Sequence, residues 1–191
     1  MPLVLPGSTS GDIQIKAPAI AGSNILIAPA ETGTLRTTVS SGTLIQSVTN
    51  QVTAAAGPLS TRFVIDDTIP QNTEGTEIFT QSITPTSASN ILEIDIIAQL
   101  YNTTASYCGL ALFQDSTANA IAASFYVINS SWCIPVPLKY RMVAGTTSST
   151  TFKVRVGGDT AVGNNLYLNG RTSRIFGGVI ISYINIKEYA V

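Results

Sequence analysis

The sequence predicts an all-β protein: a jelly-roll-like β-sandwich body (residues 42–191) preceded by an extended N-terminal arm (residues 1–41). Three observations support this prediction. Apolar residues recur at every second position in run after run, and turn residues separate the runs at a spacing of roughly 8–15 residues. No segment carries an apolar stripe of period 3.6 over three turns. A succession of about ten short strands without helices is typical of a two-sheet sandwich.

Two short β-type runs, 13–16 and 25–27, punctuate the arm, and an Ala-Pro-Ala step follows each of them. Each proline removes a backbone donor and so limits its run to a sheet edge or a short pairing. A short strand with one apolar face cannot bury that face alone. We therefore expect an assembly arm that grips a neighbouring subunit or another protein through Ile13, Ile15, Pro18, Ile25, Ile27 and Pro29.

Ten β-type runs are expected in the body: 44–53, 62–65, 77–83, 91–99, 107–114, 120–128, 132–142, 151–156, 166–168 and 179–187. Pro135 and Pro137 occupy alternate positions of one run, which predicts an edge strand or a bent one. The stretch 115–123 is the one place where a helical turn is expected. Lys153 and Arg155 point to one face of their run, and we expect them to pair across strands with the carboxylates of run 91–99 at about 0.2–1 kcal/mol a pair.

A polar hinge, residues 66–75, separates two apolar runs, because its acidic pair, proline and glycine stop a strand or helix from continuing. The only local cluster of carboxylates lies in and beside it: Asp66, Asp67, Glu74 and Glu77. Carboxylates with loop carbonyls suit calcium, but the ligand spacing of an EF-hand loop is absent. The favoured interpretation is that Asp66 and Asp67 bond turn amides and that Glu74 is solvated, so no metal site is expected.

Charge is scarce in this chain. Only 11% of its residues are charged, against roughly 25% in a typical soluble protein, so we expect much of the surface to be covered by copies of the chain or by another protein. The formal net charge of −1 gives no electrostatic footprint for nucleic acid. No apolar run of about 18 residues predicts a membrane span. Residues 1–7 lack a basic region and a long apolar core, so no signal peptide is expected.

The residue types of this chain do not predict a catalytic site. The chain has no histidine, which removes the commonest general base and the triads built on it. Cys108 and Cys133 lie in apolar runs, and buried free thiols are favoured over a disulfide. The pairs Gly157-Gly158 and Gly177-Gly178 open no helix, so neither predicts a phosphate cradle. We expect no catalytic residues, no zinc site and no cofactor.

Two sets of residues remain as candidates for binding. The first comprises aromatic residues that either stack on sugars or belong to the core or a subunit interface, the latter being the commoner fate: Tyr101, Tyr107, Phe113, Phe125, Tyr126 and Trp132. The second is the loop flanked by Arg171 and Arg174, which is either solvated or pairs with a carboxylate of another subunit. Intersubunit or loop contacts are accordingly expected at Asp66, Asp67, Arg171, Arg174 and Trp132.

Several segments of the body resemble a β-rich domain widespread in structural proteins of tailed bacteriophages, of the tail-fibre or head-decoration type. They are Asp66-Asp67-Thr68-Ile69-Pro70-Gln71-Asn72-Thr73-Glu74-Gly75, Ile83-Thr84-Pro85-Thr86-Ser87-Ala88, Ala111-Leu112-Phe113-Gln114-Asp115-Ser116, the stretch 144–155 and Phe176-Gly177-Gly178. The resemblance implies a trimeric, non-enzymatic virion component assembled in the host cytoplasm, and it supplies no catalytic residues.

Length departs from the fibre pattern, since only about forty residues precede the body and a fibre normally has a long shaft. A short arm with a compact head favours a protein that decorates or cements the capsid. The expected partners are then copies of the chain, as a homotrimer, and other virion proteins such as the major capsid protein. The alternative is a receptor-binding fibre tip that recognises host surface glycan.

Overall fold

The computed structural model describes residues 3–6, 12–15, 40–129, 131–158 and 166–191. The chain divides into two units, Met1–Thr37 and Thr38–Val191. In the first unit, β1 (Leu3–Pro6) and β2 (Asp12–Ile15) pair antiparallel, with Leu3 opposite Ile15. Of the residues expected in the arm, Ile13 and Ile15 lie on β2, and Pro18, Ile25, Ile27 and Pro29 lie outside the described residues.

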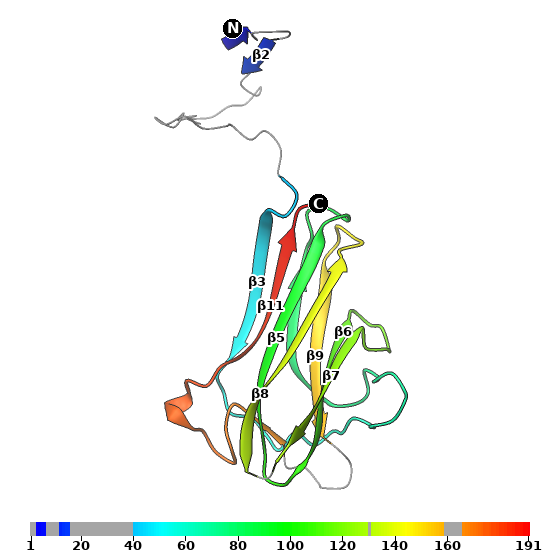
Figure 1. The fold of residues 1–191 in the computed structure, drawn as a ribbon, viewed down its shortest axis with the longest axis vertical. Helices are drawn as coiled ribbons and strands as arrows, with labels where there is room; N and C mark the ends of the chain where they lie inside the picture. Colours follow the sequence, from blue (N-terminus) through cyan, green and yellow to red (C-terminus); the bar gives the residue numbers. More distant parts are fainter. Residues whose placement is uncertain (1–2, 7–11, 16–39, 130, 159–165) are drawn as a thin grey trace. The chain divides into compact units, whose positions relative to one another are not determined.

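The second unit, the body, consists of two antiparallel sheets (Figure 1). The first sheet, which we call the charged sheet, has the order β3 (Leu44–Val52), β11 (Ser182–Tyr189), β5 (Ile91–Asn102), β8 (Trp132–Val143), and β10 (Leu166–Leu168) pairs with the last residues of β5. The second, which we call the covered sheet, has the order β4 (Thr76–Ile83), β9 (Thr150–Gly158), β6 (Ser106–Gln114), β7 (Ala122–Ile128).

This strand order is that of a jelly roll. The chain passes from one sheet to the other at almost every connection, from β3 to β4, then to β5 and β6, and only β6 and β7 are neighbours joined directly by a turn. Apart from the short β10, the body has eight strands in two four-stranded layers, and such crossing connections define the double Greek key. The predicted all-β, jelly-roll-like sandwich is therefore confirmed. Among the described residues, no helix is long and apolar enough to span a membrane.

The core lies between the two sheets and follows the period-2 pattern that predicted the strands. Leu92, Ile94 and Ile96 of β5 are buried with their neighbours in sequence only half-buried. Phe152 and Val154 of β9 face them from the covered sheet. Burying each such side chain contributes about 1.5–3 kcal/mol relative to leaving it exposed, so the alternating pattern fixes which face of each strand turns inward.

Side chains close both open edges of the sandwich. Such edges expose unpaired backbone groups, and here carbonyl oxygens of one sheet accept hydrogen bonds from side chains of the other. The bonds are Asn50 Nδ2 to Thr80 O (3.0 Å), Gln46 Nε2 to Thr84 O (2.8 Å), Ser124 Oγ to Pro137 O (3.1 Å) and Tyr126 OH to Pro137 O (3.4 Å). Pro135 and Pro137 lie on β8, which pairs only with β5, so the predicted edge strand is confirmed.

A buried carboxylate joins β11 to the turn that follows β4. Glu188 is fully buried and accepts hydrogen bonds from Thr86 N and Oγ1 (both 2.8 Å), Asn90 Nδ2 (2.6 Å) and Gln46 Nε2 (2.5 Å). Burial opposes ionisation, but the bonds from Gln46, Asn90 and Thr86 outweigh it and lower the pKa of Glu188 to about 2. The carboxylate therefore stays ionised although no cation among the described residues pairs with it, and it holds the turn against the end of the sheet.

Two expected elements are absent from the body. Residues 62–65 form no strand, because this run lies on the outside of the covered sheet and buries a single aromatic side chain there. The stretch 115–123 contains no helical turn. Asp115 takes a left-handed φ of 52°, and its carboxylate accepts a hydrogen bond from Thr151 N (2.8 Å), which makes a tight turn before β7.

The expected charge pairing is also corrected. Lys153 and Arg155 lie on β9 of the covered sheet, whereas Glu93 and Asp95 lie on β5 of the charged sheet. The carboxylates instead meet cations of their own sheet: Lys139 Nζ lies 3.0 Å from Asp95 Oδ1, and Lys187 Nζ lies 3.4 Å from Asp95 Oδ2 and 3.9 Å from Glu93 Oε1. Period-2 patterning gives the face of a strand but not the sheet to which it belongs.

Candidate functional site

The segment 62–75 crosses the outer face of the covered sheet and is anchored there by Phe63, which is only 4% exposed. Three glycines make room for its ring and backbone. A Cβ atom on Gly75 or Gly109 would lie 2.8 or 2.9 Å from the ring, and one on Gly157 would lie 2.6 Å from Phe63 N. Any other residue at these positions would lift the segment off the sheet, so Gly157 serves a close backbone approach.

Arg155 holds the other end of the same segment. Its Nε donates to Glu74 O (2.7 Å) and its Nη2 to Gly75 O (2.8 Å), while its Nη1 lies 3.4 Å from Glu77 Oε2. The guanidinium thus bonds two backbone carbonyls and one carboxylate, which is the fork geometry that arginine provides. The hinge is a fixed part of the body surface.

The carboxylates of the hinge bond their own turn. Asp66 Oδ1 accepts hydrogen bonds from Thr68 Oγ1 (2.5 Å) and Thr68 N (2.8 Å), and these bonds lower the pKa of Asp66. Glu74 is half-buried rather than solvated, and its Oε2 accepts from Gln71 N (3.1 Å). The predicted bonding of a turn amide by Asp66 is confirmed. In the part of the chain that the structure describes, no three metal-ligating side chains gather at one point.

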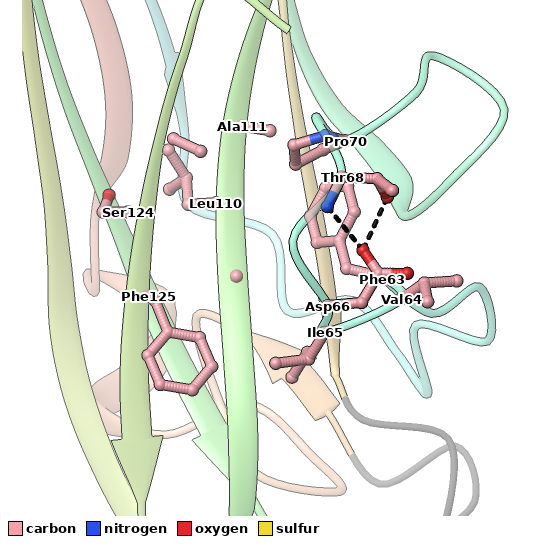
Figure 2. Close-up of a pocket in the computed structure, with 12 residues that line it drawn as sticks. Phe63, Val64, Ile65, Asp66, Thr68, Pro70, Leu110, Ala111, Ser124 and Phe125 are labelled. Atoms are coloured by element: carbon pink, nitrogen blue, oxygen red, sulfur yellow. Dashed lines mark hydrogen bonds between the residues drawn. The ribbon is translucent and has the colours of Figure 1, made fainter. Parts of the chain in front are cut away.

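A groove of about 210 Å³ lies between this segment and β7 (Figure 2). Its floor consists of small residues on the outer face of the covered sheet: Gly109 and Ala111 of β6 and Ala123 of β7. Figure 2 shows Ile65 on one wall and Phe125 on the other, with Asp66 beside Ile65. The groove is therefore an apolar trough with one carboxylate at its rim.

Exposed apolar side chains continue beyond the groove. Tyr107 and Phe125 stack with their ring centroids 5.2 Å apart and an interplanar angle of 23°, and both are about half exposed, as is Val127. Contiguous apolar patches on a folded surface commonly mark interaction sites. Of the six aromatic residues considered from the sequence, Tyr107, Phe125 and Trp132 are exposed, Tyr101 and Phe113 are buried, and Tyr126 is half-buried.

Arg171 and Arg174 lie in the loop between β10 and β11. Arg171 lies over the ring of Tyr101, 5.2 Å from its centroid, and its Nη2 donates to the Tyr101 hydroxyl (3.3 Å), which lowers the pKa of that tyrosine. Neither arginine forms an ion pair with a carboxylate among the described residues. The structure does not bring Arg171 or Arg174 together with Asp66 and Asp67 within one chain, and it places Trp132 at the start of β8.

One residue of this loop was not identified from the sequence as a site residue. Phe176 is 78% exposed and begins a 3-10 turn, Phe176–Gly178, with a left-handed φ of 49°. Gly177 and Gly178 follow with φ of 64° and 87°. A bulky residue in this region costs on the order of 1–3 kcal/mol and occurs mostly at functional sites. The only feature of the sequence that could have identified Phe176 as a site residue is a bulky side chain directly before two glycines.

The two thiols differ from each other. Both cysteines are free, so the preference for free thiols over a disulfide is confirmed, but Cys133 is exposed and its expected burial is wrong. Cys133 lies on the edge strand β8, where one face turns to solvent. Burial raises the pKa of Cys108 to about 12, which keeps that thiol protonated and unreactive at neutral pH.

No protein-family model matches this sequence, and no curated protein matches it. Among solved structures, it is similar to the C-terminal domain of EclA, a sugar-binding protein, at 12% identity over 88% of this chain and 98% of the other, with a TM-score of 0.39. It is similar to dimeric latent PorU from Porphyromonas gingivalis at 8% identity over 82% and 14% of the two chains, with a TM-score of 0.44.

A third similar structure is the T13 viral particle of infectious bursal disease virus, at 12% identity over 97% of this chain and 47% of the viral chain, with a TM-score of 0.39. The chain thus spans about half the length of that viral protein and a small part of PorU. All three TM-scores lie below 0.5, so these likenesses establish no common function.

Proposed function

We propose that this chain is a non-enzymatic structural protein of a bacteriophage virion, a homotrimeric surface component that decorates or cements the capsid through its N-terminal arm. The expected partners are copies of itself and the major capsid protein. Support comes from the sequence resemblance, from a jelly-roll body poor in charge, and from apolar side chains displayed around an open groove.

The observation that carries the role of the arm is the pairing of β1 with β2. The two strands match over four residues each, and an isolated two-stranded ribbon is at best marginally stable in water. A ribbon of this length gains stability when another surface completes it, either by adding a strand or by covering its apolar face. Strand addition provides affinity through main-chain hydrogen bonds, and apolar burial adds roughly 25 cal/mol per Å².

Deletion of residues 1–41 tests this function, because the body has its own core and keeps its fold without them. We expect the shortened protein to be folded and to lose its addition to particles. In the full chain, replacing Ile13 and Ile15 by Asp should also reduce addition, whereas Gln14→Asp, which changes a polar residue between them in the sequence, should reduce it less. Particle binding that survives the deletion rejects the role of the arm.

A second candidate function is that of a receptor-binding fibre tip that recognises host glycan. The stacked pair of Tyr107 and Phe125 and the exposed Trp132 favour it, because exposed aromatic faces stack on sugar rings. A glycan array with the purified protein tests this alternative, with Phe125→Ala and Trp132→Ala as variants. The fibre tip is favoured over decoration if either variant loses glycan binding and if the purified wild-type protein blocks adsorption of the phage to its host.

A further inference from the structure

The body carries two surfaces that complement each other and do not meet within one chain. One is the groove beside Asp66. The other is the loop 169–181, which we call the Phe176 loop. No residue of this loop lines the groove, and in Figure 1 the orange loop before β11 and the teal segment between β3 and β4 lie on opposite sides of the body.

The Phe176 loop displays apolar side chains that the body leaves largely uncovered. Phe176 is 78% exposed, Val179 is 71% exposed and Ile181 is 40% exposed. The left-handed φ of Phe176 adds a backbone cost, and no packing within the described body offsets that cost because the ring is exposed. Contact with a partner is the physical account that explains both the exposure of this aromatic ring and the strain of its backbone.

Size and chemistry match the ring to the groove. Its volume of about 210 Å³ exceeds the roughly 150 Å³ of an apolar cavity that takes up benzene. The floor of Gly109, Ala111 and Ala123 leaves space above the strands, and Ile65 and Phe125 offer apolar contact from both sides. An aromatic side chain seated in such a pocket is the usual form of an interface hot spot.

Charge matches at the rim as well. Asp66 lies at the rim of the groove and Asp67 follows it in the chain, outside the groove lining. Neither forms an ion pair among the described residues, and the same is true of Arg171 and Arg174 in the Phe176 loop. Most other charged side chains of the body sheets already have partners of opposite sign, as in the pairs of Lys139 and Lys187. Arg62, Arg141 and Lys153 also form no ion pair among the described residues. The acids of the hinge and the arginines of the Phe176 loop nevertheless have opposite signs on separate sides of one body, so they can complement each other between copies.

We propose that neighbouring copies of this chain meet head to tail, with Phe176 of one copy seated in the groove of the next and its arginines facing Asp66 and Asp67. The inference rests on the self-assembly included in the proposed function and specifies its surfaces. Because two different surfaces meet, the interface is heterologous, and it closes into a ring when the rotation between neighbouring copies divides the circle evenly. The three copies of a homotrimer would each contribute one loop and one groove.

Complementary variants of the full chain test the proposal by sedimentation at matched concentrations. Phe176→Ser removes the ring and Ala123→Arg fills the groove, and each should weaken self-association at least about tenfold. A mixture of the two variants should form a one-to-one dimer, because each chain retains the half that the other lacks. The matched controls Val143→Ser and Ala118→Arg, exposed and outside both surfaces, should keep the wild-type mass.

Several results would overturn the interface. They are a wild-type mass in either variant, a mixture that stays monomeric although both variants unfold at the wild-type temperature, or a wild-type protein that is itself monomeric. If a monomeric wild type still adds to particles, this inference fails and the proposed function stands. If the variants behave as expected but the protein adds to no particle, the interface stands and the proposed function fails.

A charge exchange provides a second, independent test. Arg174→Glu should weaken self-association severalfold, and so should Asp67→Arg, while the double variant should recover most of the loss because the attraction is restored with its signs reversed. Asp67 is chosen because Asp66 holds its own turn through Thr68. A double variant that associates no better than either single variant contradicts the proposed charge pairing.

Discussion

The outward side chains of the two sheets are stabilised in different ways. On the charged sheet, Glu93 and Asp95 face Lys139 and Lys187 and satisfy one another. On the covered sheet, the segment 62–75 lies across the strands, Arg155 pairs with Glu77, and the groove beside the segment is lined mainly by apolar side chains. The comparison teaches that one face is finished by ion pairs between its own strands, whereas the other is partly covered by a segment of the chain and keeps an open apolar groove suited to contact with proteins.

The largest difference between the faces should appear in the reactivity of the two cysteines. Cys133 is exposed on β8 of the charged sheet, whereas Cys108 is buried in β6 of the covered sheet with a pKa raised to about 12. Labelling of Cys108 requires opening of the core, so it should be at least about a thousandfold slower than that of Cys133. Mass spectrometry after timed exposure to a thiol reagent measures both rates, and comparable rates would show that β6 is not buried.

Removing the anchor of the covered face should cost the most stability. Phe63→Ala removes a ring that is 4% exposed and leaves a cavity over three glycines, so we expect a loss of about 3–5 kcal/mol. Phe125→Ala, on the same face but half exposed, should cost less than about 1 kcal/mol. Denaturant unfolding of both variants provides the measurement. Equal losses would mean that the segment 62–75 is not held by Phe63.

Acid should weaken the charged sheet at its buried end through Glu188. The folded-state pKa of about 2 lies below the ordinary value of 4.5, so the stabilisation is fully present above about pH 5 and is lost as the pH falls toward 2. We expect Glu188→Gln to lower the free energy of unfolding by roughly 2–3 kcal/mol at pH 7. The gap between variant and wild type should narrow with acid, and a gap independent of pH would contradict the ionised state.

The smallest effect is expected from the exposed charges. Asp95→Asn removes the pairs with Lys139 and Lys187, yet the Lys139 side chain is 80% exposed, and such surface pairs contribute about 0–1 kcal/mol. The loss should shrink further at high salt. Unfolding curves at low and high ionic strength check this, and a loss as large as that of Phe63→Ala would reverse the comparison between the faces.

Strand patterning predicted most of the fold, because burial in a sandwich alternates residue by residue. It failed at residues 62–65, since a run that buries one aromatic ring on the outside of a sheet has the same alternation as a strand. The pairing of Lys153 and Arg155 failed for a related reason: alternation does not assign a strand to a sheet, and that assignment depends on long-range topology.

The candidate site could be predicted only in part. Arg171, Arg174, Asp66 and Asp67 attracted notice as charges in loops, and the structure shows each group without an ion pair among the described residues. The groove could not be predicted, because its floor combines Gly109 with Ala123 from the neighbouring strand and depends on the register between β6 and β7. The strain at Phe176 is a property of the backbone and leaves no mark in composition.

The hydrogen bonds that close both flanks of the sandwich affect how one body can associate with another. Because Asn50, Gln46, Ser124 and Tyr126 already bond the carbonyl groups they face, those positions are poor templates for stacking one body onto another by continuous sheet growth. At these positions, copies of the body are then more readily joined through loops and side chains than through edge-to-edge strand pairing. A body built this way is less exposed to edge-to-edge aggregation when it is concentrated during assembly.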